Sequence, residues 1–494
     1  MSLPSLDEQI LNSSSYYDFP EERLLFVNLE RDFGRVAPLA EAAVSYSARN
    51  KCYFLNFHLS SDLGEYFRDR VVNFLQGKII SNKVTDYLRL FDIKCLSTGK
   101  LKKKKTRLTL TENEIQYLFQ AKKNEMQQSQ LDLNFLTDWL KSKEFSFSFA
   151  IEELISIIEN HKIDRLFVWN GRFVLSTLVK IASSRAKKHL SCIEFGSEIN
   201  QSFEVFRSRP TDHSDLRARV NAREHSSEAR LVKQWSERQI IEWVLSRKEN
   251  EFTSKFTEAS KIEFDFPFIT LFLTSLWEMD VERTSFSQGS VSQEQAVILL
   301  SEISRELQLK LVLRVHPNPS MPNYEIFETE YWRKFVEDSH LCNCVIVPAN
   351  STLSSYLLAD HSKYNFVYAS FIGLELIFRK IPTFFFAMMP WDKSSDVRDM
   401  HYFDHAIRSF LKKPLVIEKS ETYPFIRYLL EFGFSFKYMR KDKQGYIYFG
   451  DRILCRERNT SSFIVKLSLK LFKLLQLGRI RKILSHLFPH IQFK

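Results

Sequence analysis

Continuous apolar runs alternate with amphipathic stretches near the start of the chain. LLFVNL (24–29) and KCYFLNF (51–57) are such runs, and the segment between them, DFGRVAPLAEAAVSYSARN, has a helical pattern. Apolar runs of this length are typical of strands buried on both faces, and a helix between two of them makes a β-α-β unit. The pattern predicts a parallel sheet covered by helices.

The alternation resumes further along the first half. We expect a helix over IEELISIIENHK (151–162), a strand over DRLFVWN (164–170), a helix over GRFVLSTLVKIASSRAKK (171–188) and a strand over LSCIEFG (190–196). The region from about 76 to 146 is polar and contains many lysines, and we interpret it as a helical insertion. Its KKKK run is expected to be a solvated surface turn rather than a binding patch.

A second series of strands and helices follows a polar stretch, about 210–260, in which we expect helices packed between two halves. Three helix-like segments, SQEQAVILLSEISRELQ, TLSSYLLADHSK and FIGLELIFRK, separate apolar runs in this series. The pattern predicts two successive Rossmann-like halves, with ligands held in the cleft between them. The expected strands are PFITLFLTS, LKLVLRV, NCVIVPA (343–349), NFVYAS (365–370) and PTFFFA (382–387).

A length of 494 residues exceeds that of one ordinary domain. The expected fold class is α/β, with two Rossmann-like domains facing a cleft, a helical insertion and a C-terminal amphipathic helix. We place the N-terminal domain at 1–255, the second domain at 256–450 and a basic tail at 451–494.

The end of that tail, residues 461–494, has seven Lys or Arg residues and no Asp or Glu. On a helix, Lys466, Lys470 and Lys473 share one face, while leucines and an isoleucine occupy the other. A basic amphipathic helix of this kind lies on anionic membranes. The alternative is a terminal helix that packs back on the N-terminal half.

The net charge of +10 favours an anionic partner. The basic residues are spread among 60 acidic ones rather than gathered in a stripe with aromatic residues, which argues against nucleic acid. Six dispersed cysteines without a CxxC pair indicate reduced thiols in a cytosolic protein. The N-terminal segment lacks the pattern of a signal peptide, and no apolar stretch reaches the roughly 20 residues that span a bilayer. We therefore expect a cytoplasmic protein, peripheral at the inner face of the cytoplasmic membrane.

Polar residues follow several predicted strands of the second series. The carboxyl ends of parallel strands meet along one edge of a sheet, where open α/β folds bind ligands. We therefore expect these side chains to converge on one ligand. Thr274 and Ser275 end the first strand, Arg314 and His316 the second, and Ser370 the fourth.

These residues have chemistry suited to a nucleotide. Arg314 can make a bidentate contact to a phosphate, and His316 can donate a hydrogen bond to it or protonate a leaving group. Ser370 stands at an expected helix N-cap, where backbone N–H groups attract phosphate. Glu375, five residues further on, can accept hydrogen bonds from ribose hydroxyls. The structural alternatives are a simple cap for Ser370 and an ordinary helix residue for Glu375.

The motifs resemble the donor half of the GT-B glycosyltransferases that build capsular and related surface polysaccharides. The resemblance rests on R-V-H-P-N (314–318), S-S-Y (354–356) and a strand ending in Ser before a G-x-E helix and a Lys-x-Pro turn (369–382). In the first half, N-G-R (170–172) and the segment from I-E-F-G to F-E-V-F (193–206) are similar to the N-terminal pattern of such proteins. T-S-L-W-E, at 274–278, keeps part of another of their motifs.

The resemblance implies a site for a donor nucleotide and a base from the N-terminal half that deprotonates the acceptor hydroxyl. Candidates for the base are Glu194 and Asp212; Glu194 is alternatively a paired structural acid, and an enzyme that retains sugar configuration needs no such base. No metal or other cofactor is expected, because GT-B enzymes stabilise the leaving phosphate with helix dipoles and basic groups. The implied donor contacts are Arg314, His316, Ser370, Glu375, Ser275, Ser354 and Tyr356.

The implied function is transfer of a sugar from a nucleotide-sugar donor to a surface-polysaccharide or lipid-linked glycan acceptor. A CDP-polyol phosphotransferase of cell-surface polymer synthesis is the alternative enzyme, because similar Arg-x-His-Pro segments occur there. A non-catalytic, membrane-associated scaffold is the alternative outside catalysis.

Overall fold

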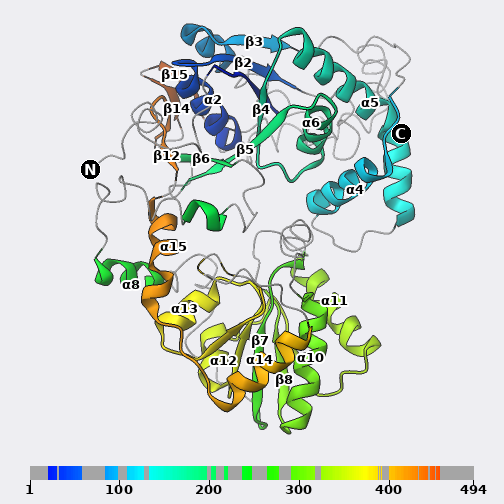
Figure 1. Cartoon of the computed structure of the whole chain (residues 1–494), viewed down its shortest axis with the longest axis vertical. Coiled ribbons are helices and arrows are strands. Elements are labelled where there is room, and N and C mark those ends of the chain that lie inside the picture. Colours follow the sequence, from blue (N-terminus) through cyan, green and yellow to red (C-terminus); the bar gives the residue numbers. More distant parts are fainter. Residues whose placement is uncertain are drawn as a thin grey trace, which may run out of the picture.

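The computed structural model contains two α/β units, which lie one above the other along the long axis of the molecule (Figure 1). Helices α8 (Glu237–Ser246) and α15 (Lys419–Glu431) lie at one side, near the boundary of the two units. The structure describes residues 21–29, 33–57, 84–97, 108–126, 133–196, 202–206, 216–220, 236–246, 264–276, 291–316, 324–387, 389, 391, 400–431, 433–442, 446–450 and 452–456.

The first unit is built on a sheet with the strand order β12-β6-β5-β4-β1-β2-β3. Strands β1 to β5 are parallel, while β6 runs antiparallel to β5 and β12 antiparallel to β6. The strands are β1 (Arg23–Asn28), β2 (Lys51–Asn56), β3 (Lys94–Ser97), β4 (Arg165–Trp169), β5 (His189–Phe195), β6 (Ser202–Phe206) and β12 (Phe434–Ser435).

Helices cover both faces of this sheet. Because side chains alternate along a strand, Leu24 and Phe26 of β1 face α2 (Phe33–Ser47), whereas Leu25 and Val27 face the opposite layer. That layer consists of α4 (Glu112–Met126), α5 (Leu133–Asn160) and α6 (Val174–Arg185). Burial on both faces explains why the central strand is apolar at every position but its ends.

The second unit is built on an all-parallel sheet with the order β11-β10-β7-β8-β9. One face packs on α10 (Gln293–Glu306), α11 (Tyr324–Asp338) and α14 (Met400–Lys412), and the other on α12 (Ser355–His361) and α13 (Ile372–Phe378). The strands are β7 (Phe268–Phe272), β8 (Lys310–Arg314), β9 (Cys344–Val347), β10 (Asn365–Val367) and β11 (Thr383–Phe385).

Both sheets are doubly wound, which confirms the expected α/β class with two Rossmann-like units. In each sheet the next two strands of the series lie on one side of the first, and the chain then crosses to the other side of that first strand. The crossing places a topological switch point between β1 and β4 in the first sheet and between β7 and β10 in the second. In folds of this kind ligands bind beyond the carboxyl ends of the strands at the switch point.

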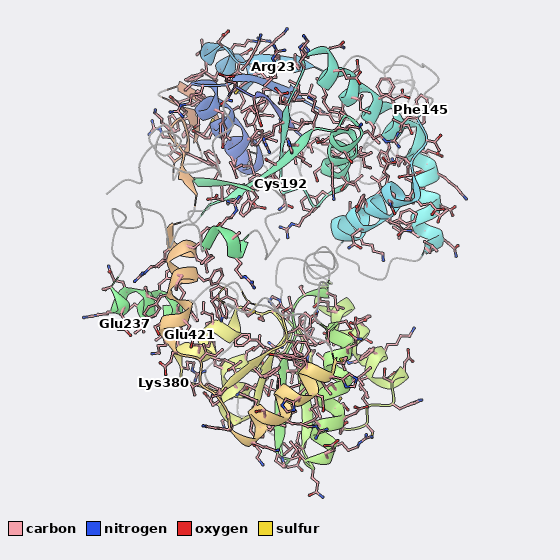
Figure 2. All side chains as sticks on the ribbon, viewed as in Figure 1. Arg23, Phe145, Cys192, Glu237, Lys380 and Glu421 are labelled. Carbon is pink, nitrogen blue, oxygen red and sulfur yellow. The ribbon has the colours of Figure 1, made fainter. Side chains whose placement is uncertain are left out.

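The expectation of helices between the halves is confirmed for residues 216–220 and for α8. Arg219 forms a buried ion pair with Glu204 of β6, at 2.6 Å, while Val220 packs against Phe425 and Tyr428 of α15. Helix α8 packs on α13 and α15, and Figure 2 shows Glu237 of α8 and Glu421 of α15 on these neighbouring helices. Residues 216–220 therefore contact both units.

After α15 the chain returns to the first unit. Gly433, with a φ of 96°, packs so closely that an added Cβ would lie 2.7 Å from the Cα of Gly196. The carboxylate of Glu41 in α2 accepts hydrogen bonds from the backbone N–H groups of residues 437–439, which are Lys437, Tyr438 and Met439. Burial raises the pKa of Glu41 to about 7, although these donors and Lys437 oppose that shift. The last part of the expected 256–450 domain, from Gly433 on, therefore packs with the first unit.

A small antiparallel sheet follows this return, made of β13 (Met439–Lys441), β14 (Tyr446–Phe449) and β15 (Arg452–Arg456). Phe449 stacks on Tyr87 and Tyr438, which fixes the sheet to the first unit. The amphipathic segment expected at 461–494 lies outside the described residues. Within the described part of the chain, no helix is both long and apolar enough to cross a membrane.

The expected helical insertion at 76–146 is wrong in one part. Residues 94–97, KCLS, form β3, the edge strand that pairs with β2, and Arg89–Phe91 form a short 3-10 helix before it. A four-residue edge strand that starts with Lys and ends with Ser has no continuous apolar run to identify it. The helical part is present as α4 and α5, and α5 extends to Asn160 through most of the separate helix expected at 151–162.

Gly373 allows α13 to pack directly on the second sheet, so we predict that Gly373→Ala destabilises the protein. A Cβ at this position would lie 2.2 Å from an atom of the Phe385 ring and 3.3 Å from a methyl group of Val367. Overpacking of this kind costs about 1–3 kcal/mol, which outweighs the roughly 1 kcal/mol that alanine adds to a helix. The measurement is the free energy of unfolding in urea.

Phe385→Leu provides the matched test of this cause. Gly373→Ala should cost less in a Phe385→Leu background than in the wild type, because the smaller side chain vacates the space. Equal costs in the two backgrounds would contradict a clash with the Phe385 ring.

Candidate functional site

The loops that follow β7 and β10 meet at the carboxyl edge of the second sheet, directly over its switch point. The hydroxyl of Thr274, two residues after β7, accepts a hydrogen bond from the backbone N–H of Ala369 at 3.2 Å. Thr274 is 7% exposed, so the contact is shielded from water. A direct hydrogen bond thus joins the ends of two strands whose polar residues we expected to converge.

Side chains from two helices fix the loop after β7. The side-chain amide of Gln293 accepts from the backbone N–H of Thr274 at 2.9 Å and donates to its carbonyl at 3.1 Å. The carboxylate of Glu328 accepts from the backbone N–H of Leu276 at 2.6 Å. Between these two points Ser275 is fully buried. The predicted contact of Ser275 with a donor therefore stays a prediction, and in this conformation its side chain is enclosed by the protein.

Arg314 ends β8, next to β7, and is almost fully buried. Its Nε donates to the hydroxyl of Ser355 in α12 at 3.2 Å, and its Nη1 donates to the carbonyl of Pro348 in the loop after β9. The guanidinium therefore ties the end of β8 to α12 and to the neighbouring loop. Ser355 had no predicted role of its own, although it is the middle residue of the S-S-Y segment at 354–356.

His316 lies two residues beyond Arg314 on the same edge. No hydrogen-bond partner reaches its buried Nδ1 atom in the part of the chain that the structure describes. Burial, together with the positive charge of Arg314, lowers the pKa of His316 to about 4. The imidazole is therefore neutral at neutral pH, where it can donate one hydrogen bond but cannot act as an imidazolium acid unless an anion raises its pKa.

Tyr356 and Glu375 join α12 to α13. The Tyr356 hydroxyl donates to Oε2 of Glu375 at 2.6 Å, and Glu375 is 8% exposed. The guanidinium of Arg379 lies 5.3 Å from the centre of the Tyr356 ring and also bonds to Asp360 at 2.7 Å. Beside this pair, Ser354 caps α12 by accepting from Leu357 N at 3.5 Å. Two predicted donor contacts, Tyr356 and Glu375, are thus brought into direct contact with one another.

The expected role of Ser370 as a helix N-cap is wrong. Helix α13 begins at Ile372 and its N-cap residue is Phe371, which supplies no side-chain cap. The carbonyl of Ser370 instead accepts from Gly373 N at 3.1 Å, so a turn after β10 delays the helix by one residue. Ser370 remains a buried residue of the switch-point loop.

A second polar cluster lies at the carboxyl edge of the first sheet. Asn170 donates to Oε2 of Glu194, Arg172 donates to the Asn170 side chain at 2.7 Å, and Phe195 N donates to Oε1 of Glu194 at 3.1 Å. Arg172 also lies 3.9 Å from Glu194. Both carboxylate oxygens of the first candidate base thus accept hydrogen bonds from the protein, as the structural alternative for Glu194 requires. Asp212, the second candidate, lies outside the described residues.

The N-G-R turn that builds this cluster depends on its glycine. Asn170 and Gly171 have φ values of 60° and 78°, in the left-handed region that favours glycine. A Cβ on Gly171 would also lie 2.5 Å from the sulfur of Cys192, which is labelled in Figure 2. The turn therefore sets Asn170 and Arg172 beside the end of β5.

The structure groups the predicted site residues at two edges. Arg314, His316, Ser370, Glu375, Ser275, Ser354 and Tyr356 all lie at or next to the carboxyl edge of the second sheet, whereas Glu194 lies at that of the first. Within the described residues, no group of three or more His, Cys, Asp or Glu side chains is placed to hold a metal ion. Gln293 and Glu328, which fix the loop after β7, had no sequence signal, because their contacts span 19 and 52 residues.

Comparisons with known proteins give only distant likenesses. No protein-family model matches the chain, and no curated protein matches it. KpsC of Thermosulfurimonas dismutans, a beta Kdo 2,7 transferase, is 14% identical with a TM-score of 0.28, over 56% of this chain and 88% of that one. UDP-GlcNAc 2-epimerase of Methanocaldococcus jannaschii is 12% identical with a TM-score of 0.25, over 82% and 99%. Sucrose-phosphate synthase of Thermosynechococcus elongatus is 9% identical with a TM-score of 0.24, over 83% and 94%. At these scores the likenesses carry no argument about the chemistry of this chain.

The lowered pKa of His316 predicts a pH-dependent contribution to stability. Between about pH 4 and its ordinary value of 6.5, the unfolded chain binds a proton at this residue that the folded chain does not. The free energy of unfolding of the wild type, relative to His316→Ala, should therefore rise with pH through this range, by about 3 kcal/mol in all.

The measurement is urea unfolding of both proteins at several pH values between about 4 and 7. Glu41, whose raised pKa gives the opposite slope, is present in both proteins and cancels in the difference. A difference that stays constant with pH would contradict the lowered pKa of His316.

Proposed function

We propose that this chain is a glycosyltransferase that moves a sugar from a nucleotide-sugar donor to a surface-polysaccharide or lipid-linked glycan acceptor. The observation that carries the proposal is the arrangement at the second switch point, where Arg314 and His316 adjoin the loops bonded through Thr274 and Ala369. A basic group, a neutral imidazole and a joined pair of strand ends suit an anionic ligand at this edge.

Arg314 and His316 receive the phosphate of the donor that carries the sugar in this proposal. The charge of Arg314 is buried, so its attraction to a phosphate is screened less than at a surface. Neutral His316 donates a hydrogen bond to a phosphate oxygen. The carboxylate of Glu375 accepts from a ribose hydroxyl, which replaces or shares the bond from Tyr356.

Transfer breaks the bond between the anomeric carbon and the phosphate oxygen and forms one to the acceptor oxygen. The electron pair leaves with the nucleotide phosphate, and the increased negative charge is stabilised by Arg314 and hydrogen bonding from His316. A bound anion raises the pKa of His316, so proton uptake accompanies binding below about the ordinary His value. The proton of the acceptor hydroxyl passes to a base, for which Glu194 and Asp212 remain the candidates.

The acceptor and the location of the protein are inferred from the sequence. The basic segment 461–494 suits an anionic membrane surface, and a lipid-linked acceptor is held at such a surface. We place the protein at the inner face of the cytoplasmic membrane, where nucleotide sugars are available to a peripheral enzyme.

The proposal predicts that one of UDP, GDP, CMP and CDP stabilises the protein against heat. A ligand at about 100 times its Kd adds roughly 2.7 kcal/mol to the free energy of unfolding. Arg314→Ala should lose this stabilisation, because it removes the buried cation. Arg408→Ala is the control, since Arg408 of α14 forms exposed ion pairs with Asp404 and with Glu306 at the end of α10. This variant should bind the nucleotide as the wild type does.

Two results would contradict the proposal. One is the absence of stabilisation by all four nucleotides, which favours a scaffold. The other is a nucleotide response that persists unchanged in folded Arg314→Ala. If a CDP-activated polyol serves as donor, the isolated product contains a phosphodiester instead of a new glycosidic bond, which identifies the phosphotransferase alternative.

A further inference from the structure

Two buried polar side chains outside the proposed nucleotide contacts hold the loop after β7. Gln293 of α10 and Glu328 of α11 are each 3% exposed, and each bonds to the backbone of this loop. We call Gln293 and Glu328 the loop clamp. A buried polar group without a partner is costly, so both bonds fix the loop strongly.

The side-chain amide of Gln293 bonds to both backbone polar groups of Thr274. Its amide accepts from Thr274 N and donates to Thr274 O, at 2.9 and 3.1 Å, as a neighbouring strand would. Gln293 is the first residue of α10, and its place is set by the capping box in which Ser292 and Gln295 bond to each other's backbone N–H groups.

Glu328 holds the other end of the same loop. Oε1 accepts from Leu276 N at 2.6 Å, and the next residue, Thr329, accepts from Ala349 N at 3.2 Å in the loop after β9. Helix α11 thus contacts two loops at the carboxyl edge. With Thr274 also bonded to Ala369, the loop after β7 is held on three sides, from α10, from α11 and from the end of β10.

We propose that Gln293 and Glu328 are positioning residues for the donor nucleotide. This inference rests on the proposed function, since it takes the second switch point as the nucleotide site. The clamp holds residues 274–276 in the conformation that receives the ligand, so that little ordering is needed when it binds. Neither side chain touches the nucleotide; both act through the loop backbone.

Substitutions that remove the clamp should weaken nucleotide binding about tenfold. Gln293→Ala and Glu328→Ala each delete a bond to the loop. Gln293→Glu keeps the shape but cannot donate to Thr274 O when ionised, so it should also weaken binding. Glu328→Gln keeps an acceptor for Leu276 N, so it should bind the nucleotide nearly as tightly as the wild type does. If the negative charge itself were needed, this variant would bind more weakly.

Asn343→Ala is the control for a purely structural loss. Asn343 bonds to Ser301 and Ser304 of α10, but at the amino end of β9, on the opposite edge of the sheet. The Asn343→Ala substitution should lower the melting temperature and leave nucleotide affinity unchanged. Affinity is measured by calorimetry well below each melting temperature, with whichever of UDP, GDP, CMP or CDP stabilises the wild type.

The outcomes separate the two proposals. If the wild type binds a nucleotide and Gln293→Ala, Gln293→Glu and Glu328→Ala bind it equally well, the loop clamp is overturned while the nucleotide site stands. Equal weakening of nucleotide binding in Asn343→Ala would mean that the loss follows from lower stability, and it would also overturn the proposed role of the loop clamp. If Glu328→Ala does not fold, the nucleotide affinities of Gln293→Glu and Glu328→Gln are compared with that of the wild type instead. The loop clamp predicts weaker binding for the first variant and nearly unchanged binding for the second. If no nucleotide binds the wild type, both proposals fail.

Discussion

Strand β7 lies between β8 and β10, and the arrangement of the candidate site depends on this placement. In the parallel register Phe272 is opposite Arg314 on one side and Val367 on the other, so the three strands end at the same level. The sequence FITLF is buried at every position, as a strand with helices on both faces and partners on both edges must be. Because the strands end together, the Thr274 hydroxyl reaches Ala369 and the buried charge of Arg314 lies beside the same switch point.

Buried charged groups connect segments of the chain that are far apart in sequence. The carboxylate of Glu41 binds the backbone of residues 437–439, and the Glu204–Arg219 pair fastens the short helix at 216–220, whose Val220 packs on α15. Removing one member of a buried ion pair typically costs about 3–5 kcal/mol, because the other charge is left without compensation. The second sheet supplies the candidate nucleotide edge, and these contacts link the helices beside it to the first unit.

The sequence predicts most of the parallel strands, because a strand that is buried on both faces appears as a continuous apolar run. It misses β3 and β6 and the returning strands after Gly433, since these strands are short and contain polar or charged residues, such as Lys94 in β3 and Glu204 in β6. The positions of Arg314 and His316 at the edge of the sheet could be predicted, because both residues follow an apolar strand. The bonds of Gln293 and Glu328 could not be predicted, because they join separate elements through backbone groups that leave no pattern in the sequence. The N-cap expected at Ser370 fails for a smaller reason, a single extra turn residue before α13.

The central claim is that a nucleotide binds at the carboxyl edge of the second sheet. The most direct measurement is hydrogen–deuterium exchange of the full chain with and without the nucleotide that stabilises it. The account predicts slower exchange of backbone amides at 273–276, 314–316 and 368–375, with little change at the edge of the first sheet. Protection confined to residues 170–172 and 194–196 would contradict the assignment, because it would place the nucleotide at the other switch point.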